Sequence, residues 1–279
     1  MNSLVIVIAL LALVFVGVTI SVVSRVESHS EKPSAVAQHK LGFLYTVVSV
    51  ILWPLGLLSF VVGVVILIPL LFLIPPKYLS LVIRLFCRFV LLSVGVVVRV
   101  KGKERFRRSK AFVVMFNHQS LFDAFVLGVV IYRYMTALGA AYQFKLPLWG
   151  TLLRRWEIIP IPRTNLTQAI RSIELAREKL DSGIPVLVAP EGTRTLTGEI
   201  GEFKKGPFHL ALGSKADILP MVIQGAFEIK QKTDWRLKPG IVRVNTGNFI
   251  TLEQYRGLSV EELRNYVRVR LRELAGEIP

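Results

Sequence analysis

The amino-terminal third of the chain is dominated by long apolar runs. Leu4–Val23 carries no charged residue and is about as long as the hydrocarbon core of a bilayer is thick, roughly 20 helical residues. No lysine or arginine precedes this run and no small-residue cleavage site follows it. The pattern therefore favours a retained transmembrane helix over a cleaved signal peptide. The next segment, Ser24–Lys40, is a polar linker of mixed charge.

A second apolar run, Leu41–Ile74, is longer than one membrane span requires. Pro54 and Gly56 interrupt it, which leaves two shapes open. It is either one tilted or kinked span or a helical hairpin that dips into one leaflet. We expect Pro75-Pro76 to end the helix, because proline lacks the backbone N–H that a helix interior needs.

The third apolar segment, Leu79–Val98, differs because it carries Arg84 and Arg88, four positions apart and thus on one helical face. It is typical of a helix at the membrane interface, with its arginines toward the headgroups. A buried helix of a following domain would show the same pattern, and both interpretations stay open.

From Arg99 onward, short apolar runs alternate with helical patterns, which predicts an α/β domain. The chain thus divides into a transmembrane helix with its linker (1–40), a membrane-embedded or interfacial helical segment (41–98) and the α/β domain (99–279). The predicted strands are Phe112–Phe116, Ile158–Ile161, Val186–Ala189, Leu219–Ile223 and Ile241–Asn245. The predicted helices are Leu166–Leu180, which stops before Gly183, and a basic helix from the capping box at Ser259 to Leu274.

Composition and charge support a membrane location. The chain is 52% hydrophobic, and 35 Lys and Arg against 19 Asp and Glu give a net charge of +16. A basic domain tethered to a membrane is attracted to anionic headgroups by about 1 kcal/mol per basic residue near the surface. No nucleic-acid-binding motif accompanies the charge, so we expect no nucleic-acid partner. Cys87 is the only cysteine, so we expect no disulfide framework and no bound metal.

The first candidate for chemistry is the pair His118 and Asp123, which directly follows a predicted strand. Inside one helix a spacing of five would place the two side chains about 140° apart. They can meet if His118 sits on the turn and Asp123 reaches back from the first helical turn. A neutral imidazole held by a carboxylate is a general base. The alternative is structural: Ser120-x-x-Asp123 is also a capping box, and Asn117 either orients the turn or merely belongs to it.

A second candidate group is rich in potential phosphate donors. Glu191-Gly192-Thr193-Arg194 follows another predicted strand. Gly192 allows a sharp turn or a close approach to a ligand, and Thr193 and Arg194 can donate to phosphate oxygens. Glu191 can fix the arginine or a ligand hydroxyl. Taken singly, these residues, like Arg163, Lys204 and Lys205, are also ordinary turn and surface residues.

Five sequence blocks, taken in their order along the chain, resemble the glycerolipid acyltransferase family, and within it the lysophosphatidate acyltransferase branch. The resemblance covers roughly Lys101–Ile223. The blocks are Asn117-His118 through Asp123, Ile161-Pro162-Arg163, Pro190-Glu191-Gly192-Thr193-Arg194, Phe203-Lys204-Lys205-Gly206 and Ile218–Val222. The chain departs from the family pattern at Glu157 and Pro160, where Gly and Phe are usual, and at Ala189, where Phe is usual.

The resemblance implies an α/β fold with a mixed sheet flanked by helices, on an amino-terminal membrane-embedded helical region. It implies that His118 is the general base and Asp123 its orienting partner. It also implies that the acceptor phosphate is bound by Arg163, Glu191, Gly192, Thr193 and Arg194, with Lys204 and Lys205 as further candidates, and that Pro220 helps to shape the acyl-donor site. The donor would be acyl-CoA or acyl carrier protein, with no bound cofactor.

The expected activity is acyl transfer to lysophosphatidate, giving phosphatidate, by an integral protein of a bacterial inner membrane or the endoplasmic reticulum with its catalytic domain on the cytoplasmic face. Three alternatives remain. The acceptor could be another lysophospholipid, a lyso-aminolipid or glycerol 3-phosphate. The protein could be a non-catalytic adaptor that binds anionic membrane lipids. A Ser-His-Asp hydrolase is the third, but no Gly-x-Ser-x-Gly elbow is present.

Overall fold

The computed structural model describes residues 35–162 and 164–278. Their strands form one mixed sheet of seven in the order β1-β7-β6-β2-β5-β3-β4. Five strands, β2 to β6, run parallel to one another, and β7 pairs antiparallel with β6 and parallel with β1. The strands are β1 (Val96–Lys101), β2 (Val113–Phe116), β3 (Thr136–Ala140), β4 (Ile159–Ile161), β5 (Val186–Val188), β6 (Ile218–Gln224) and β7 (Gly240–Thr246).

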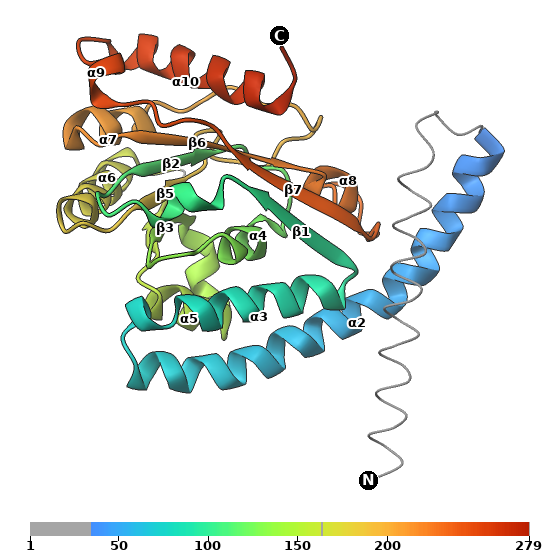
Figure 1. Cartoon of the computed structure of the whole chain (residues 1–279). Helices are drawn as coiled ribbons and strands as arrows, with labels where there is room; N and C mark the ends of the chain where they lie inside the picture. Colours follow the sequence, from blue (N-terminus) through green and yellow to red (C-terminus); the bar gives the residue numbers. More distant parts are fainter. Residues whose placement is uncertain (1–34, 163, 279) are drawn as a thin grey trace.

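Helices cover both faces of this sheet, as Figure 1 shows. Side-chain alternation along β2 explains the two layers, because Val113 and Met115 join one core and Val114 and Phe116 the other. One layer holds α6 (Leu166–Asp181), α7 (Gly206–Ser214) and α10 (Val260–Ala275), with the short α9 (Leu252–Tyr255) nearby. The other holds α2 (Ala35–Leu73), α3 (Ser80–Ser93), α4 (Asp123–Val129) and α5 (Trp149–Arg155), and α8 (Ala226–Ile229) follows β6. The predicted fold class, a mixed sheet flanked by helices, is confirmed.

The second apolar run forms one continuous helix, α2, rather than a hairpin, with Pro54 inside it. Its segment Gly42–Leu73 is long and apolar enough to cross a membrane, with a mean hydropathy of 2.8 in its most apolar window. Most of that window is not buried against the protein, which fits a helix that meets lipid on one side. The helix ends before Pro75, as expected. The first predicted span, Leu4–Val23, lies outside the described residues.

The third apolar segment is a helix for only part of its predicted length. Helix α3 ends at Ser93, and β1 begins at Val96, so the predicted division between residues 98 and 99 falls inside this strand. The physical reason is local: Gly95 has a positive φ of 74°, and the following valines pair with β7.

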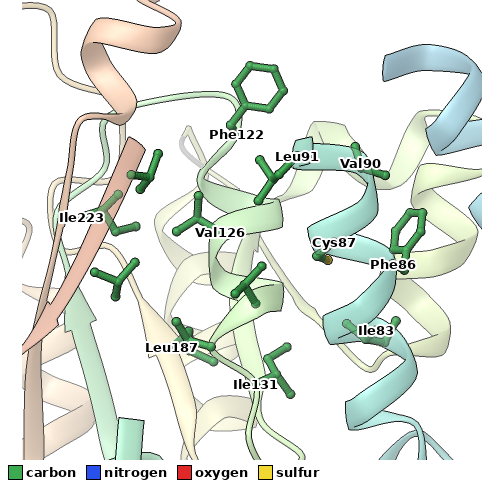
Figure 2. Packing of buried hydrophobic residues seen from close by; sticks show 14 of the residues in the cluster. Ile83, Phe86, Cys87, Val90, Leu91, Phe122, Val126, Ile131, Leu187 and Ile223 are labelled. Atoms are coloured by element: carbon green, nitrogen blue, oxygen red, sulfur yellow. The ribbon is translucent and has the colours of Figure 1, made fainter. Parts of the chain in front are cut away.

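Helix α3 packs between helix α2 and the sheet layer. Its buried face, which includes Cys87 and Leu91, lies beside Val126 of α4, and Leu187 of the sheet belongs to the same core (Figure 2). Its other face leaves large apolar side chains exposed, namely Leu81, Leu85, Phe89 and Leu92. The segment is therefore a packed helix of the domain that also has an exposed apolar face, and its place at a membrane interface stays a prediction.

The sequence pattern located most of the strands and two of the domain's other helices, while α5, α7, α8 and α9 were not predicted. All five predicted strands are present, each with ends within one residue of the prediction, and so are the helix at Leu166 and the capped helix after Ser259. Two strands were missed. β1 was hidden in an apolar run read as helix, and β3 has the sequence Thr-Ala-Leu-Gly-Ala, which shows no strand pattern.

Candidate active site

The candidate residues gather at the edge of the sheet where the parallel strands end. His118 follows β2, and Glu191 follows β5, the neighbouring strand. Because parallel strands point their carboxyl ends to the same edge, residues 73 positions apart in sequence come into contact here. Their contact is direct: the backbone N–H of His118 donates to Oε1 of Glu191 over 2.9 Å.

His118 and Asp123 form a hydrogen-bonded pair. Asp123 is the first residue of α4 and reaches back across the turn, so that its Oδ2 lies 2.7 Å from Nδ1 of His118. The same oxygen accepts from the backbone N–H groups of Gln119, at 2.6 Å, and Ser120, at 3.0 Å. An ionised carboxylate only accepts, so Nδ1 of the imidazole carries the proton and Nε2 keeps a lone pair for a substrate proton.

The turn that carries His118 is tied to the sheet and to the segment after α8. The side-chain amide of Asn117 donates to the carbonyl of Ile223 (2.9 Å) and accepts from its N–H (2.7 Å), which prolongs the β2–β6 pairing by one residue. Asn117 therefore orients the turn instead of merely occupying it. The hydroxyl of Ser120 donates to the carbonyl of Lys230 over 2.9 Å. Contacts of Asn117 and Ser120, which flank His118 in the sequence, thus hold the turn in place.

Glu191 has a structural position that the sequence did not indicate. Its Oε2 accepts from the N–H of Gly201 over 3.2 Å while Oε1 holds His118, and the side chain is buried. Burial raises the pKa of the Glu191 carboxyl, and the two backbone N–H donors oppose that rise. Both carboxylate oxygens of Glu191 thus accept from main-chain N–H groups, and its contact with a ligand hydroxyl stays a prediction.

A cavity of about 1150 Å³ opens beside the imidazole. Pockets for drug-sized ligands measure about 300–1000 Å³, so this one has room for a longer molecule. Its walls are mostly apolar and come from α3 to α6, as with Phe86, Phe125, Trp149 and Ile173. A polar, mostly basic part of its lining, here called the cationic rim, comprises Thr193, Arg194, Lys204, Lys205, His209 and Lys232. His118 therefore lines one cavity together with apolar walls and the cationic rim.

Comparison with solved structures shows the same fold. A crystal structure of the 1-acyl-sn-glycerophosphate (LPA) acyltransferase PlsC from Thermotoga maritima superposes with a TM-score of 0.70 at 24% identity, covering 85% of this chain and 97% of that one. The acyltransferase family model matches residues 97–224. This segment belongs to the acyltransferase family.

Three curated relatives of this chain carry the name 1-acyl-sn-glycerol-3-phosphate acyltransferase. The chain is 30% identical over 183 residues to a 1-acyl-sn-glycerol-3-phosphate acyltransferase of Cocos nucifera, covering 65% of this chain and 58% of the relative. It is 30% identical over 190 residues to the 1-acyl-sn-glycerol-3-phosphate acyltransferase alpha of Bos taurus (67% and 66%). It is 27% identical over 202 residues to the 1-acyl-sn-glycerol-3-phosphate acyltransferase of Pseudomonas aeruginosa (71% and 77%). The first relatives, from Cocos and Limnanthes, are matched over only 58% and 61% of their length.

The acyltransferase segment contains most of the predicted site residues. Gly192, with a positive φ of 69°, Thr193 and Arg194 form the turn after β5 and line the cavity, as do Lys204 and Lys205 at the start of α7. Lys205 also pairs with Glu261 of α10 at 2.5 Å, which draws part of its charge away from the cavity. Arg163 lies outside the described residues.

Pro220 is not brought to this site. It lies in the middle of β6, paired in register with Met115 of β2, and is not among the residues that line the cavity. Its carbonyl accepts from the N–H of Gly247 over 2.9 Å. The strand residues that line the cavity come from β2, β5, β3 and β4, whereas β6 lies on the other side of β2.

Two lysines at the site were missed by the sequence analysis. Lys232 lines the cavity, with Nζ 3.5 Å from Oγ1 of Thr193. Lys230 is buried beside it, and burial together with the charge of Arg194 lowers its pKa. Both come from the polar segment after α8, which carried no motif. Within residues 35–162 and 164–278, no three His, Cys, Asp or Glu side chains lie close enough to share a metal ion.

Proposed function

We propose that this protein transfers an acyl group from acyl-CoA or acyl carrier protein to the free hydroxyl of lysophosphatidate, giving phosphatidate. One observation carries the proposal: the His118–Asp123 pair lines a large cavity that also has mostly apolar walls and a cationic rim. A lysophosphatidate molecule has the same order of parts, with an apolar chain, a free hydroxyl and a phosphate. The names of the curated relatives support this acceptor.

In the proposed reaction, Nε2 of His118 takes the proton of the acceptor hydroxyl as that oxygen attacks the thioester carbonyl of the donor. Asp123, which is only 1% exposed, holds the imidazole and stabilises the imidazolium that forms. Collapse of the tetrahedral intermediate breaks the carbon–sulfur bond, and the imidazolium returns its proton to the leaving thiolate. The new bond is the ester of the product, so no covalent acyl-enzyme is required.

The cationic rim would bind the acceptor phosphate so that its hydroxyl meets His118. Arg194 is the leading candidate, because a planar guanidinium can donate two hydrogen bonds to a phosphate. The backbone N–H of Thr195 donates to the carbonyl of His118 over 2.8 Å. This hydrogen bond joins the turn that carries Arg194 to the turn that carries His118. Arg163 stays in the proposal on the family resemblance alone.

The apolar helices would place this site at a membrane. Helix α2 is long enough to span, and α3 exposes apolar side chains. We propose an integral protein of a bacterial inner membrane or the endoplasmic reticulum, with the acyltransferase domain on the cytoplasmic face, where the basic surface meets anionic headgroups. Lipid substrates would then enter from the bilayer.

The test is acyl transfer by the purified full chain in lipid nanodiscs, with one labelled acyl-CoA and a panel of acceptors: lysophosphatidate, other lysophospholipids, a lyso-aminolipid and glycerol 3-phosphate. We expect transfer to lysophosphatidate to be fastest, and His118→Ala to lower it at least about a hundredfold while the protein stays folded. Faster transfer to another acceptor would replace lysophosphatidate in the proposal. Binding of anionic vesicles without transfer to any acceptor would make the protein an adaptor.

Arg194 provides a sharper test of the acceptor site. Arg194→Ala should raise the KM for lysophosphatidate about tenfold or more, with a smaller effect on the donor KM, because a charge-assisted contact to phosphate is lost. Arg194→Lys should also be impaired, since an ammonium lacks the planar fork. Arg256→Ala, at an exposed arginine of the carboxyl-terminal region, is the matched control. An unchanged acceptor KM in Arg194→Ala would place the phosphate elsewhere on the rim.

A further inference from the structure

Arg194, Lys230 and Lys232 bring positive charge together near the turn after β5. Lys230 is buried close enough to Arg194 for that guanidinium to depress its pKa, and Lys232 reaches Thr193, the residue before Arg194. Asp234 acts on the pKa of Lys230 in the opposite direction, but its carboxylate is also engaged by Arg236, which contacts both oxygens at 2.9–3.1 Å. Gathering like charges costs free energy, and an anion bound among them would offset that cost.

Within the described chain, Lys232 has no acidic side chain at salt-bridge distance. Its ammonium donates to the hydroxyl of Thr193, at 3.5 Å. It differs in this from Lys205, which is paired with Glu261. The Lys232 ammonium therefore faces the cavity with hydrogen-bond donors to spare.

The segment Lys230–Leu237, here called the strap, is fixed at both ends. At one end the carbonyl of Lys230 accepts from the hydroxyl of Ser120. At the other, the N–H of Leu237 donates to Oγ of Ser49 over 2.7 Å, and the carbonyl of Trp235 accepts from Nε1 of Trp53 over 2.9 Å. Ser49 and Trp53 belong to α2, so the strap runs from the turn that carries His118 to helix α2. A lysine on a strap held in this way is presented at a defined place.

We propose that Lys232 is a further phosphate-binding residue for the lipid acceptor, positioned by the strap between the His118 turn and helix α2. It would act together with Arg194: Lys232 contacts the hydroxyl of Thr193, and Arg194 is the next residue along the chain. The anion it binds is a phosphate monoester on a single-chain lipid. This inference rests on the proposed function for the identity of that lipid, but the phosphate contact can be measured without any turnover.

The experiment compares binding of two lipids that differ only in the phosphate. Lysophosphatidate and a monoacylglycerol of the same chain are titrated into the full chain in nanodiscs, and binding is measured for wild type, Lys232→Met and Lys232→Arg. Losing one charge-assisted hydrogen bond should weaken lysophosphatidate binding roughly tenfold and leave monoacylglycerol binding unchanged. Lys232→Arg should recover most of the loss. Lys110→Met, at an exposed lysine before β2 and thus at the opposite sheet edge, is the matched control and should bind as wild type does.

A kinetic measurement separates this inference from the proposed function. Lys232→Met should raise the KM for lysophosphatidate roughly tenfold with little change in kcat or in the donor KM. If the wild type transfers acyl groups to lysophosphatidate and Lys232→Met has the same acceptor KM and affinity, the role of Lys232 is overturned while the function stands. If lysophosphatidate affinity depends on Lys232 but no acceptor is acylated, the proposed function fails and the phosphate contact stands.

Discussion

Nδ1 of His118 lies 2.7 Å from Oδ2 of Asp123, and that one oxygen also accepts two backbone N–H groups of the same turn. Asp123 is therefore both the partner of the imidazole and the residue that shapes the turn. The capping interpretation and the catalytic one are not exclusive, since a single buried carboxylate can serve both. The two roles still differ in what they predict for a substitution.

Asp123→Asn should lower kcat at least about a hundredfold, because an amide neither fixes the same tautomer nor stabilises an imidazolium. It should also lower the melting temperature, since hydrogen bonds from backbone N–H groups to a buried charge are weakened. Both quantities are measured on the same preparation. Ser259→Ala, which removes the distant cap of α10 and costs about 1 kcal/mol, is the control for stability loss alone. Near-normal turnover in Asp123→Asn would mean that Asp123 shapes the turn and has no role in catalysis.

Glu191→Gln tests whether Glu191 acts through the main chain or on the substrate. A glutamine keeps one acceptor oxygen, so one of the backbone contacts, to His118 or Gly201, is lost. We expect kcat to fall about tenfold or more, with the acceptor KM changed little, because the base is displaced and the phosphate contacts remain. A rise in KM alone would instead indicate contact with the acceptor.

The raised pKa of Glu191 also predicts how stability varies with pH. The folded protein holds the Glu191 proton more tightly than the unfolded chain does, so between the two pKa values folding favours protonation. The contribution of Glu191 to stability is full below the unfolded pKa and is lost as pH rises through the folded pKa. The free energy of unfolding of wild type minus that of Glu191→Gln should therefore decrease across that window. Denaturation at several pH values measures it, and an increase would show that the N–H donors outweigh burial.

The sequence predicted the His118–Asp123 contact because all of its determinants are local: a strand, a turn and the first residue of a helix. It could not predict the role of Glu191, since a carboxylate that accepts from main-chain N–H groups leaves no pattern in side-chain identities. Lys232 was missed for a different reason. Its place at the rim depends on contacts between the strap and α2, which join residues more than 180 positions apart.

Glu157 shows how the structure explains a departure from the family pattern. Its φ is +60°, a conformation that glycine adopts without strain, which accounts for the glycine usual at this position. The glutamate is retained in that conformation by its side chain, which accepts from the hydroxyl of Tyr134 at 2.9 Å and from Nζ of Lys179 at 2.5 Å. The Lys179 hydrogen bond lowers the pKa of Glu157.

These contacts lead to a paired prediction. Glu157→Ala should be destabilised, because it keeps the unfavourable φ and loses both side-chain contacts. Glu157→Gly loses the same contacts but relieves a strain of about 1–2 kcal/mol, so it should be more stable than the alanine variant by about that amount. Melting temperatures in one detergent decide the matter. Equal stability of the two variants would contradict strain at this position.

Trp53 of α2 contacts both the strap and Phe122 in the turn between His118 and Asp123, and two substitutions of Trp53 separate the effects of these contacts. Its indole N–H donates to the strap at Trp235, and its ring stacks on Phe122, the residue before Asp123, at 6.2 Å between centroids. Trp53→Phe keeps a ring and loses the donor, so the strap should loosen. The acceptor KM should rise about fivefold, the effect of one neutral hydrogen bond of about 1 kcal/mol, with kcat nearly unchanged. Trp53→Ala also removes the stacking partner of Phe122, so its kcat should fall as well.

The control for Trp53 is Val62→Ala, at an exposed position of the same helix, which should leave both constants unchanged. All three variants are assayed in nanodiscs, with melting temperatures to show that each is folded. If Trp53→Phe matched the wild type in acceptor KM, the strap would not depend on α2 for its position. If Trp53→Ala changed KM without kcat, Trp53 would act on the cationic rim alone and not on the turn that carries the base.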